Sequence, residues 1–177
     1  MKNLQLSWIL REIADLLELK GDNPFKIRAY RNAAHQVEHL PIDIGELGAE
    51  GRLREIRGIG PALEKKIDEW LSTGQMTYYN KLREEVPPGL LDLLTIPGLG
   101  PRLVVTLHRE LGIESIDDLE TAARGRKVRQ VKGIGGKTEM AILRGIEMWR
   151  RRGGQALAYM ARPITIELAR RLATLVG

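Results

Sequence analysis

The sequence of 177 residues contains no cysteine, one phenylalanine and three histidines. The lack of cysteine excludes disulfides, thiolate nucleophiles and cysteine-ligated metals, and it favours an intracellular compartment, so we expect a cytoplasmic protein. No stretch approaches the roughly 20 apolar residues that a membrane-spanning helix needs, so we expect no membrane partner. Nothing indicates a small-molecule substrate. The histidines His35, His39 and His108 do not occur with acids at metal-ligand spacing, which argues against a zinc site.

Acidic residues are scarce in one segment, 124–152. It holds ten Lys or Arg against two acids, Glu139 and Glu147, a local net charge of +8 in a chain whose overall net charge is +5. A concentrated cationic face favours a polyanionic partner, because binding phosphates releases their counterions. The other interpretation is a solvated basic helix end without a ligand.

Three blocks of equal length repeat one pattern, an internal repeat that predicts three copies of one structural unit. Each block has an aliphatic residue, a variable residue, glycine, an aliphatic residue and glycine, followed by helical spacing, which predicts helix, tight turn and helix. The blocks are LREIRGIGPALEKKIDEWL (53–71), LLTIPGLGPRLVVTLHREL (93–111) and VRQVKGIGGKTEMAILRGI (128–146).

The glycines of each block have two expected roles. The first can adopt the positive φ of a tight turn, and the second leaves the backbone bare where a new helix begins. One such pair could simply link two helices, but three outward-facing helix N-termini predict a repeated anion site suited to phosphate. These glycines are Gly58 and Gly60, Gly98 and Gly100, and Gly133 and Gly135.

The remaining sequence predicts an all-α protein of two small helical units built around the three repeats. Helices are expected over 5–20 and 22–40, the second capped by Asp22 or Asn23 with Pro24 in its first turn. Pro87, Pro88 and Gly89 interrupt the helical pattern. We therefore expect a domain over 1–86, a second over 90–152, and a linker with a C-terminal helix over 153–177.

The blocks resemble the helix-hairpin-helix motif of DNA-binding proteins that do not read base sequence. Together with K-I-R-A-Y-R-N-A-A before the first block, they look like the amino-terminal half of a bacterial or archaeal family X DNA polymerase, the DNA polymerase beta group. The resemblance covers residues 1–152. It implies a lyase-type domain that binds the 5′ side of a gap and, in some members, removes 5′-deoxyribose phosphate, followed by a unit that grips duplex DNA.

This resemblance makes DNA, gapped or duplex, the expected partner, with a role in DNA repair. The family's polymerising domain places two metal-binding carboxylates as D-x-D, a pattern that this sequence lacks, so this chain alone should not copy DNA. Whether the chain is a fragment or stands alone is left open, and a protein-interaction scaffold is a third hypothesis. The candidate DNA-binding residues are the six glycines and Lys26, Tyr30, Lys65, Arg102, Lys132 and Lys137.

Lys66 is the candidate for chemistry, and whether the chain is an enzyme stays open at this stage. By resemblance, Lys66 matches the Schiff-base lysine of lyase-competent members, and Lys26 and Tyr30 match residues that hold the 5′-phosphate. The two departures are Ala62, where the family has a second lysine, and Phe25, where it has a histidine. The other blocks place Thr106 and Ala141 at the position of Lys66, so the fold does not require lysine there.

Lysine chemistry requires a neutral amine, and we expect the neighbouring cation Lys65 and the positive start of the helix to lower the pKa of Lys66. Phosphate contact without chemistry, or a solvated charge, are the alternatives. Phe25 and Tyr30 could stack on a base or pack in the core, and core packing is expected for Trp8, Trp70 and Trp149.

No cofactor is expected to be required for binding. The resemblance implies that K⁺ or Na⁺ can lie between turn carbonyls and a DNA phosphate. The expected ligands are the carbonyls of Ile56, Ile59, Ile96, Leu99, Val131 and Ile134.

Overall fold

The computed structural model describes residues 2–152, and every regular element in that range is a helix. The prediction of an all-α fold is therefore confirmed. The chain divides into two compact units, the first ending at Pro87 and the second beginning at Pro88. This division falls in the proline-glycine stretch that separates the two expected domains. The C-terminal helix expected within 153–177 lies outside the described residues.

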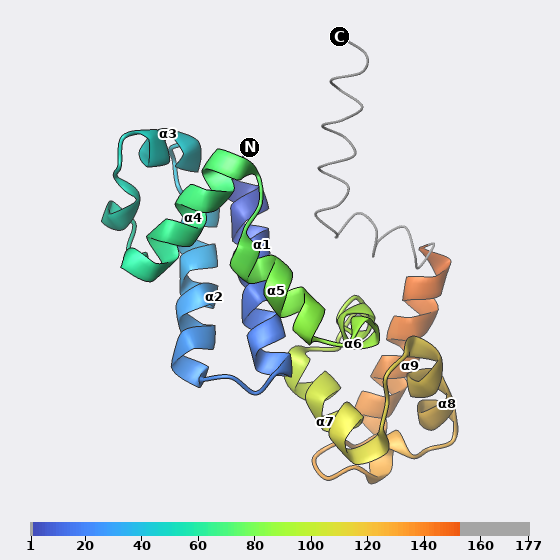
Figure 1. Ribbon diagram of the computed structural model, residues 1–177. Coiled ribbons are helices and arrows are strands. Elements are labelled where there is room, and N and C mark those ends of the chain that lie inside the picture. Colours follow the sequence, from blue (N-terminus) through green and yellow to red (C-terminus); the bar gives the residue numbers. More distant parts are fainter. Residues whose placement is uncertain (1, 153–177) are drawn as a thin grey trace. The chain divides into compact units, whose positions relative to one another are not determined.

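The first unit is built on two helices that lie side by side, α1 (Lys2–Leu19) and α2 (Pro24–Glu38) (Figure 1). α3 (Ile44–Ala49), α4 (Pro61–Thr73) and α5 (Thr77–Glu85) complete it, together with a short 3₁₀ turn, η1 (Leu53–Glu55). The side chains of one face of α1 are almost fully inaccessible and form the centre of the core, including Leu6, Leu10, Ile13 and Leu17.

The two long helices begin where specific side chains satisfy backbone groups. α2 begins after Asn23, whose side chain accepts a hydrogen bond from the Phe25 amide at 2.8 Å, with Pro24 in the first turn. α1 begins at Lys2, earlier than predicted, and Asn3 ties it to the chain at the start of α3. The Asn3 amide donates to the Ile42 carbonyl at 2.8 Å, and its oxygen accepts from the Ile44 amide at 2.7 Å.

The described part of the second unit contains α6 (Pro88–Leu93), α7 (Pro101–Leu111), α8 (Ile116–Arg124), the 3₁₀ turn η2 (Val128–Gln130) and α9 (Gly136–Arg151). Ser115 caps α8 by accepting from the Asp118 amide at 3.1 Å, and the Asp118 carboxylate accepts from the Glu114 amide at 3.3 Å. Capping thus accounts for Asp118, whereas Asp117 pairs with Arg150 at 2.9 Å.

Two glycines in this unit allow backbones to approach closely. A Cβ atom at Gly89 would lie 1.8 Å from the Glu114 carbonyl oxygen, and one at Gly145 would lie 2.6 Å from the Pro97 carbonyl oxygen. Neither separation is possible for real atoms, so only glycine fits. Gly145 therefore lets α9 pack directly against the turn that precedes α7.

The segment that precedes the turn in each repeat was expected to be a helix, but it differs from that expectation. η1 and η2 are single 3₁₀ turns, and α6 has six residues. Left-handed residues end the preceding helices early, because Gly51 follows α3 with φ +68° and Arg126 follows α8 with φ +59°. Before the first and third turns, the expected single helix is therefore a short helix followed by a separate 3₁₀ turn, α3 with η1 and α8 with η2.

Among the tryptophans, Trp8 does not pack in the core as expected, because 37% of it is exposed on the outer side of α1, whereas Trp70 and Trp149 are half-buried. No helix within residues 2–152 is long and apolar enough to cross a membrane.

Candidate functional site

The three hairpin turns have nearly the same backbone. Gly58, Gly98 and Gly133 have φ of +91°, +89° and +86°, in the left-handed region that favours glycine. The aliphatic side chains on both sides of them are buried and fix each turn to the core; they are Ile56, Ile59, Ile96, Leu99, Val131 and Ile134.

The second glycine of each turn is not required by the protein's own structure. Gly60, Gly100 and Gly135 have extended backbones that any residue adopts, with φ between −93° and −100°. A Cβ atom added at any of them would meet nothing within 4 Å. Glycine at all three positions is therefore best explained by a ligand that approaches the backbone closely.

These glycines are also the N-caps of α4, α7 and α9, and no side chain caps any of the three helices. Side chains of Asn23, Asp43 and Ser115, by contrast, cap α2, α3 and α8. Some backbone amides at the start of a hairpin helix, such as those of Ala62 in α4 and Lys137 in α9, can thus bind an anion, and the helix dipole adds a partial positive charge there.

The carbonyls proposed as cation ligands are partly used within the turns. The carbonyl oxygens of Ile56, Ile96 and Val131 each accept a hydrogen bond, of 3.0, 3.0 and 2.9 Å, from the amide three residues later. Each carbonyl retains a second lone pair, so these bonds and a cation contact are compatible.

An acid-base pair fastens the two arms of the first and third hairpins at equivalent repeat positions. Glu139 is 1% exposed, and its two carboxylate oxygens accept from the Arg129 amide at 2.9 Å and from Arg129 Nε at 2.6 Å. Arg54 and Glu64 form the corresponding pair of the first hairpin at 4.0 Å. The second hairpin has the apolar residues Leu94 and Val104 there.

The Arg129–Glu139 pair predicts a pH-dependent stability. Burial raises the pKa of Glu139, but hydrogen bonds from the Arg129 amide and guanidinium outweigh it, so the pKa is lowered overall. The stabilisation is therefore present above the ordinary Glu pKa and is lost as pH falls through the lowered folded-state value. Glu139→Gln should lower Tm by several degrees at pH 7, and the difference from the parent should shrink at pH 3.5.

A matched control for this prediction is Glu147→Gln, because Glu147 forms a solvent-exposed pair with Arg151. That substitution should change Tm little at either pH. Thermal unfolding followed by circular dichroism measures all three proteins. An equal loss of Tm for Glu139→Gln at both pH values would contradict the assigned charge interaction.

The basic segment 124–152 is only partly neutralised inside the protein. Glu120 pairs with Arg124 at 2.7 Å and with Arg150 at 2.6 Å, and Arg129 and Arg151 also have carboxylate partners. The other six cations are exposed and form no ion pair within residues 2–152: Arg126, Lys127, Lys132, Lys137, Arg144 and Arg152.

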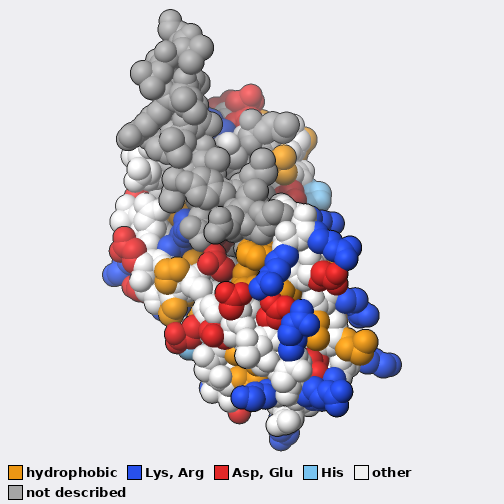
Figure 2. Space-filling model, turned by 90° about the vertical axis from the view of Figure 1, so that its right-hand side faces the viewer, with side chains coloured by type: hydrophobic (Ala, Val, Ile, Leu, Met, Phe, Trp, Pro, Cys, Tyr) orange, Lys and Arg blue, Asp and Glu red, His pale blue; other side chains and the backbone are white. Residues whose placement is uncertain are grey.

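Lys132 lies in the third turn and Lys137 in the first turn of α9, so two of these cations flank the open amides of the third hairpin. Arg102 occupies the position of Lys137 in the second hairpin. Figure 2 faces the side that carries α8 and α9 and shows Lys and Arg side chains gathered toward one edge, with carboxylates interspersed.

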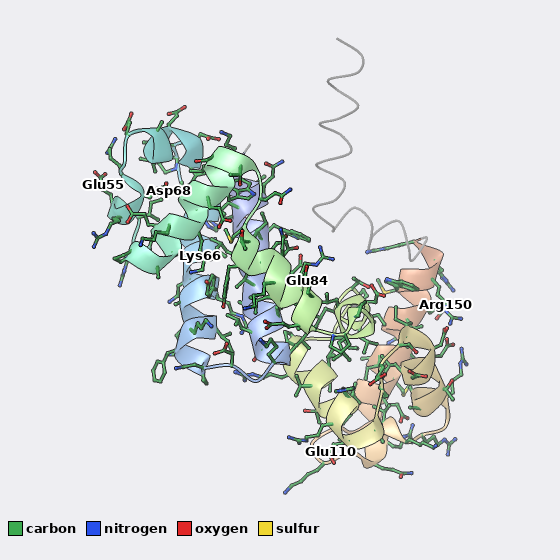
Figure 3. The ribbon with its side chains drawn as sticks, viewed as in Figure 1. Glu55, Lys66, Asp68, Glu84, Glu110 and Arg150 are labelled. Atoms are coloured by element: carbon green, nitrogen blue, oxygen red, sulfur yellow. The ribbon has the colours of Figure 1, made fainter. Side chains whose placement is uncertain are left out.

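Lys26, Tyr30 and Lys66 are brought together in the first unit by a residue that sequence reasoning missed, Tyr78. Lys66 extends from α4 toward the region of α2 and α5 (Figure 3). Its Nζ lies 4.8 Å from the centroid of the Tyr78 ring, and Lys26 Nζ lies 5.4 Å from it. Tyr30 stacks on Tyr78 with centroids 6.0 Å apart. These four residues are called the lysine–tyrosine cluster below.

The pKa of Lys66 is lowered, first by burial and second by the charge of Lys26, while Glu69 opposes the shift. The expected role of Lys65 is wrong, because Lys65 is exposed and is not among these causes. Lys66 is also the sixth residue of α4, beyond the first turn where the helix dipole acts. The pKa of Lys26 is raised, chiefly by the Tyr78 hydroxyl and also by Asp22, whose carboxylate lies 3.0 Å away.

The two aromatic residues left open by the sequence have opposite environments. Phe25 is 77% exposed, so core packing is excluded for it. Tyr30 is 7% exposed and lies within the cluster. Ala62, at the position of the missing second lysine, offers its carbonyl to Lys66 Nζ at 3.0 Å.

The histidines form no metal centre. His35 and His39 stack with ring centroids 4.4 Å apart, and within residues 2–152 no group of three or more His, Asp or Glu side chains is arranged to hold a metal ion.

Comparison with known proteins agrees with this geometry. Residues 1–76 match the model of a helix-hairpin-helix domain, and residues 90–147 match that of a SAM-like helix-hairpin-helix tandem. Over 138 residues the chain is 37% identical to the DNA polymerase/3'-5' exonuclease PolX of Bacillus subtilis (strain 168). The similarity covers 78% of this chain and 24% of that protein, so the chain spans about a quarter of the length of this curated relative.

Proposed function

We propose that this chain, a tandem helix-hairpin-helix protein related to the family X DNA polymerases, binds the sugar–phosphate backbone of DNA without reading base sequence. The observation that carries the proposal is the second glycine of each turn, which neither backbone conformation nor packing requires. Open amides at the N-termini of α4, α7 and α9 would bind phosphate oxygens, and the unpaired cations Lys132 and Lys137 would add charge.

The preferred DNA would be a gap or nick with a 5′-phosphate. The lysine–tyrosine cluster supports this preference, because Lys26 and Lys66 concentrate positive charge over one ring in the first unit. A 5′-phosphate carries more charge than a phosphodiester and so gains more from two nearby ammonium groups. A gapped duplex with a 5′-hydroxyl should bind more weakly than the same duplex with a 5′-phosphate.

Binding should be steeply salt-dependent and nearly independent of base sequence. Each phosphate neutralised contributes a slope of about −0.9 to log K against log salt. The double variant Lys132→Ala, Lys137→Ala should therefore reduce the slope by about 2 units. Fluorescence anisotropy over a salt series measures it.

Arg151→Ala is the control, because Arg151 is paired with Glu147 within the protein and should affect the slope less. A difference of about 100-fold between two duplexes of unrelated sequence would contradict backbone recognition, since it corresponds to about 2.8 kcal/mol, the size of a specific base contact.

A monovalent cation would bridge the turn carbonyls and a phosphate. We expect affinity to fall when K⁺ is replaced by tetramethylammonium at equal ionic strength, because a bulky organic cation cannot be coordinated by backbone carbonyls. The carbonyls would be those of Ile56, Ile96 and Val131 with their partners Ile59, Leu99 and Ile134. Equal affinity in both salts would argue against the cation.

A second candidate function is a 5′-deoxyribose phosphate lyase, and the lowered pKa of Lys66 favours it. Neutral Lys66 Nζ would attack the C1 aldehyde carbon of the opened sugar, and loss of water would give a protonated imine. Transfer of a C2 proton to water and cleavage of the C3–O bond would form a C2–C3 double bond and expel the 3′-phosphate with the electron pair of that C3–O bond. Water would then hydrolyse the imine and restore the amine.

In this reaction Lys26, whose pKa is raised, would stay charged and hold the 5′-phosphate. Borohydride reduces an imine to a stable amine, so trapping on a 5′-incised abasic duplex tests the proposal. No adduct from the parent protein would exclude lyase chemistry while leaving DNA binding intact.

A further inference from the structure

The lysine–tyrosine cluster contains one residue that no role so far explains. Tyr78 is the second residue of α5, and its ring is the common contact of Lys66 from α4 with Lys26 and Tyr30 from α2. Tyr78 therefore joins three helices at the candidate reaction centre. It is 12 residues from Lys66 and 52 from Lys26 in sequence, so their contact depends on the tertiary fold.

The contact is electrostatically specific. Two ammonium groups held near each other repel, and the negative face of an aromatic ring offsets part of that repulsion. Both Nζ atoms lie within the roughly 6 Å over which this attraction operates. A ring thus holds two like charges in one place where an aliphatic residue would let them separate.

The ring itself is held from two sides. Tyr30 stacks on it with an interplanar angle of 11°. Thr77, the preceding residue, donates its amide to Glu69 Oε1 at 3.0 Å, which fastens the start of α5 to α4, the helix that carries Lys66. The Tyr78 hydroxyl is buried and acts on Lys26, whose pKa it raises, whereas the ring is what Tyr78 presents to Lys66.

We propose that Tyr78 is a positioning residue for the amine of Lys66, acting through its ring face rather than its hydroxyl. The attraction of the ring for an ammonium group by itself raises the pKa of Lys66. The burial and the nearness of Lys26 that the ring imposes lower that pKa, and the net shift is downward. This role rests on the proposed lyase function. In this role Tyr78 does not contact the reacting sugar.

The test is the rate of borohydride trapping on a 5′-incised abasic duplex as a function of pH, with the full 177-residue chain. Tyr78→Leu removes the ring and should lower the trapping rate at pH 7 about tenfold, because the amine is hydrated and separated from Lys26. Its pH profile should move to higher pH, since the pKa of Lys66 returns toward the ordinary value. Tyr78→Phe keeps the ring and should retain the rate within about threefold and the midpoint of the profile.

Trp8→Leu is the matched control, an exposed aromatic residue on α1 outside the cluster, and it should match the parent. If Tyr78→Leu unfolds, Tyr78→Met replaces it as the ring-removing variant. A loss of rate without movement of the pH midpoint would show a merely structural role and overturn the proposal. If Tyr78→Phe lost as much trapping rate as Tyr78→Leu, the effect would be due to the hydroxyl, and the proposal would also be overturned.

The two proposals fail in different ways. If the parent forms no adduct, the lyase function fails and the role of Tyr78 falls with it. If the parent forms an adduct that Lys66→Ala abolishes while Tyr78→Leu behaves as the parent, only the role of Tyr78 fails.

Discussion

Lys66→Ala should abolish borohydride trapping on a 5′-incised abasic duplex, with a loss of about 100-fold or more, because alanine has no amine to form the imine. DNA affinity should stay within a few fold of the parent, since the three hairpin turns supply most of the phosphate contacts. Gel separation of the reduced adduct measures trapping, and fluorescence anisotropy measures affinity. Trapping by Lys66→Ala at the parent rate would return Lys66 to the role of a phosphate contact or a solvated charge.

Two neighbouring lysines give informative controls for this prediction. Lys65→Ala should trap like the parent, because Lys65 is exposed and the lowered pKa of Lys66 is due to burial and to Lys26. Lys26→Ala removes a charge that lowers that pKa, so the profile of trapping rate against pH should move to higher pH. The sign follows because the amine is then neutral only in more alkaline solution.

Gly100→Asp combined with Gly135→Asp should reduce DNA affinity by about tenfold or more for each hairpin, since like charges facing each other cost several kcal/mol. Stability should be unchanged or slightly raised. Both positions have extended backbones with open space around the added side chain, and aspartate is a better N-cap than glycine by a few tenths of a kcal/mol. Anisotropy measures the loss of affinity, and thermal unfolding checks that stability does not fall.

The first glycine of the same turns provides the contrast. Gly133→Ala should lower stability by about 1–2 kcal/mol, because φ of +86° is strained for any residue with a Cβ atom. Ser115→Asp, at the N-cap of α8, adds the same charge in the same unit outside the hairpins and should leave affinity within about threefold. If it weakened binding as much as Gly135→Asp, the loss would reflect net charge and not the turn.

The sequence was sufficient to predict what local patterns determine. The repeated glycines and the apolar spacing gave the all-α fold and the three turns, and Asn23 with Pro24 marked the start of α2. The 3₁₀ arms were missed because Gly51 and Arg126 end the preceding helices, and their left-handed conformations cannot be read from a helical period.

The lysine–tyrosine cluster could not be predicted, because the pairing of Tyr78 with Lys66 and Lys26 depends on how three helices pack. The wrong role for Lys65 has the same origin. Adjacent residues on a helix point in different directions, so Lys26, distant in sequence, is the cation that acts on Lys66. The Arg54–Glu64 and Arg129–Glu139 pairs, in contrast, were open to prediction, because they recur at the same positions of two repeats.

The contact at Gly145 has a consequence for binding strength. Because α9 meets the backbone of Pro97 without an intervening side chain, the second and third turns are held at a constant separation. Once one turn has bound a DNA strand, the other turn is at a high effective concentration near the same DNA. Its binding then costs little conformational entropy, because the two turns are already fixed relative to each other. The two turns should therefore bind DNA as one bivalent unit whose affinity exceeds that of either turn alone. The spacing of the two phosphates that they contact is set by the distance between the turns.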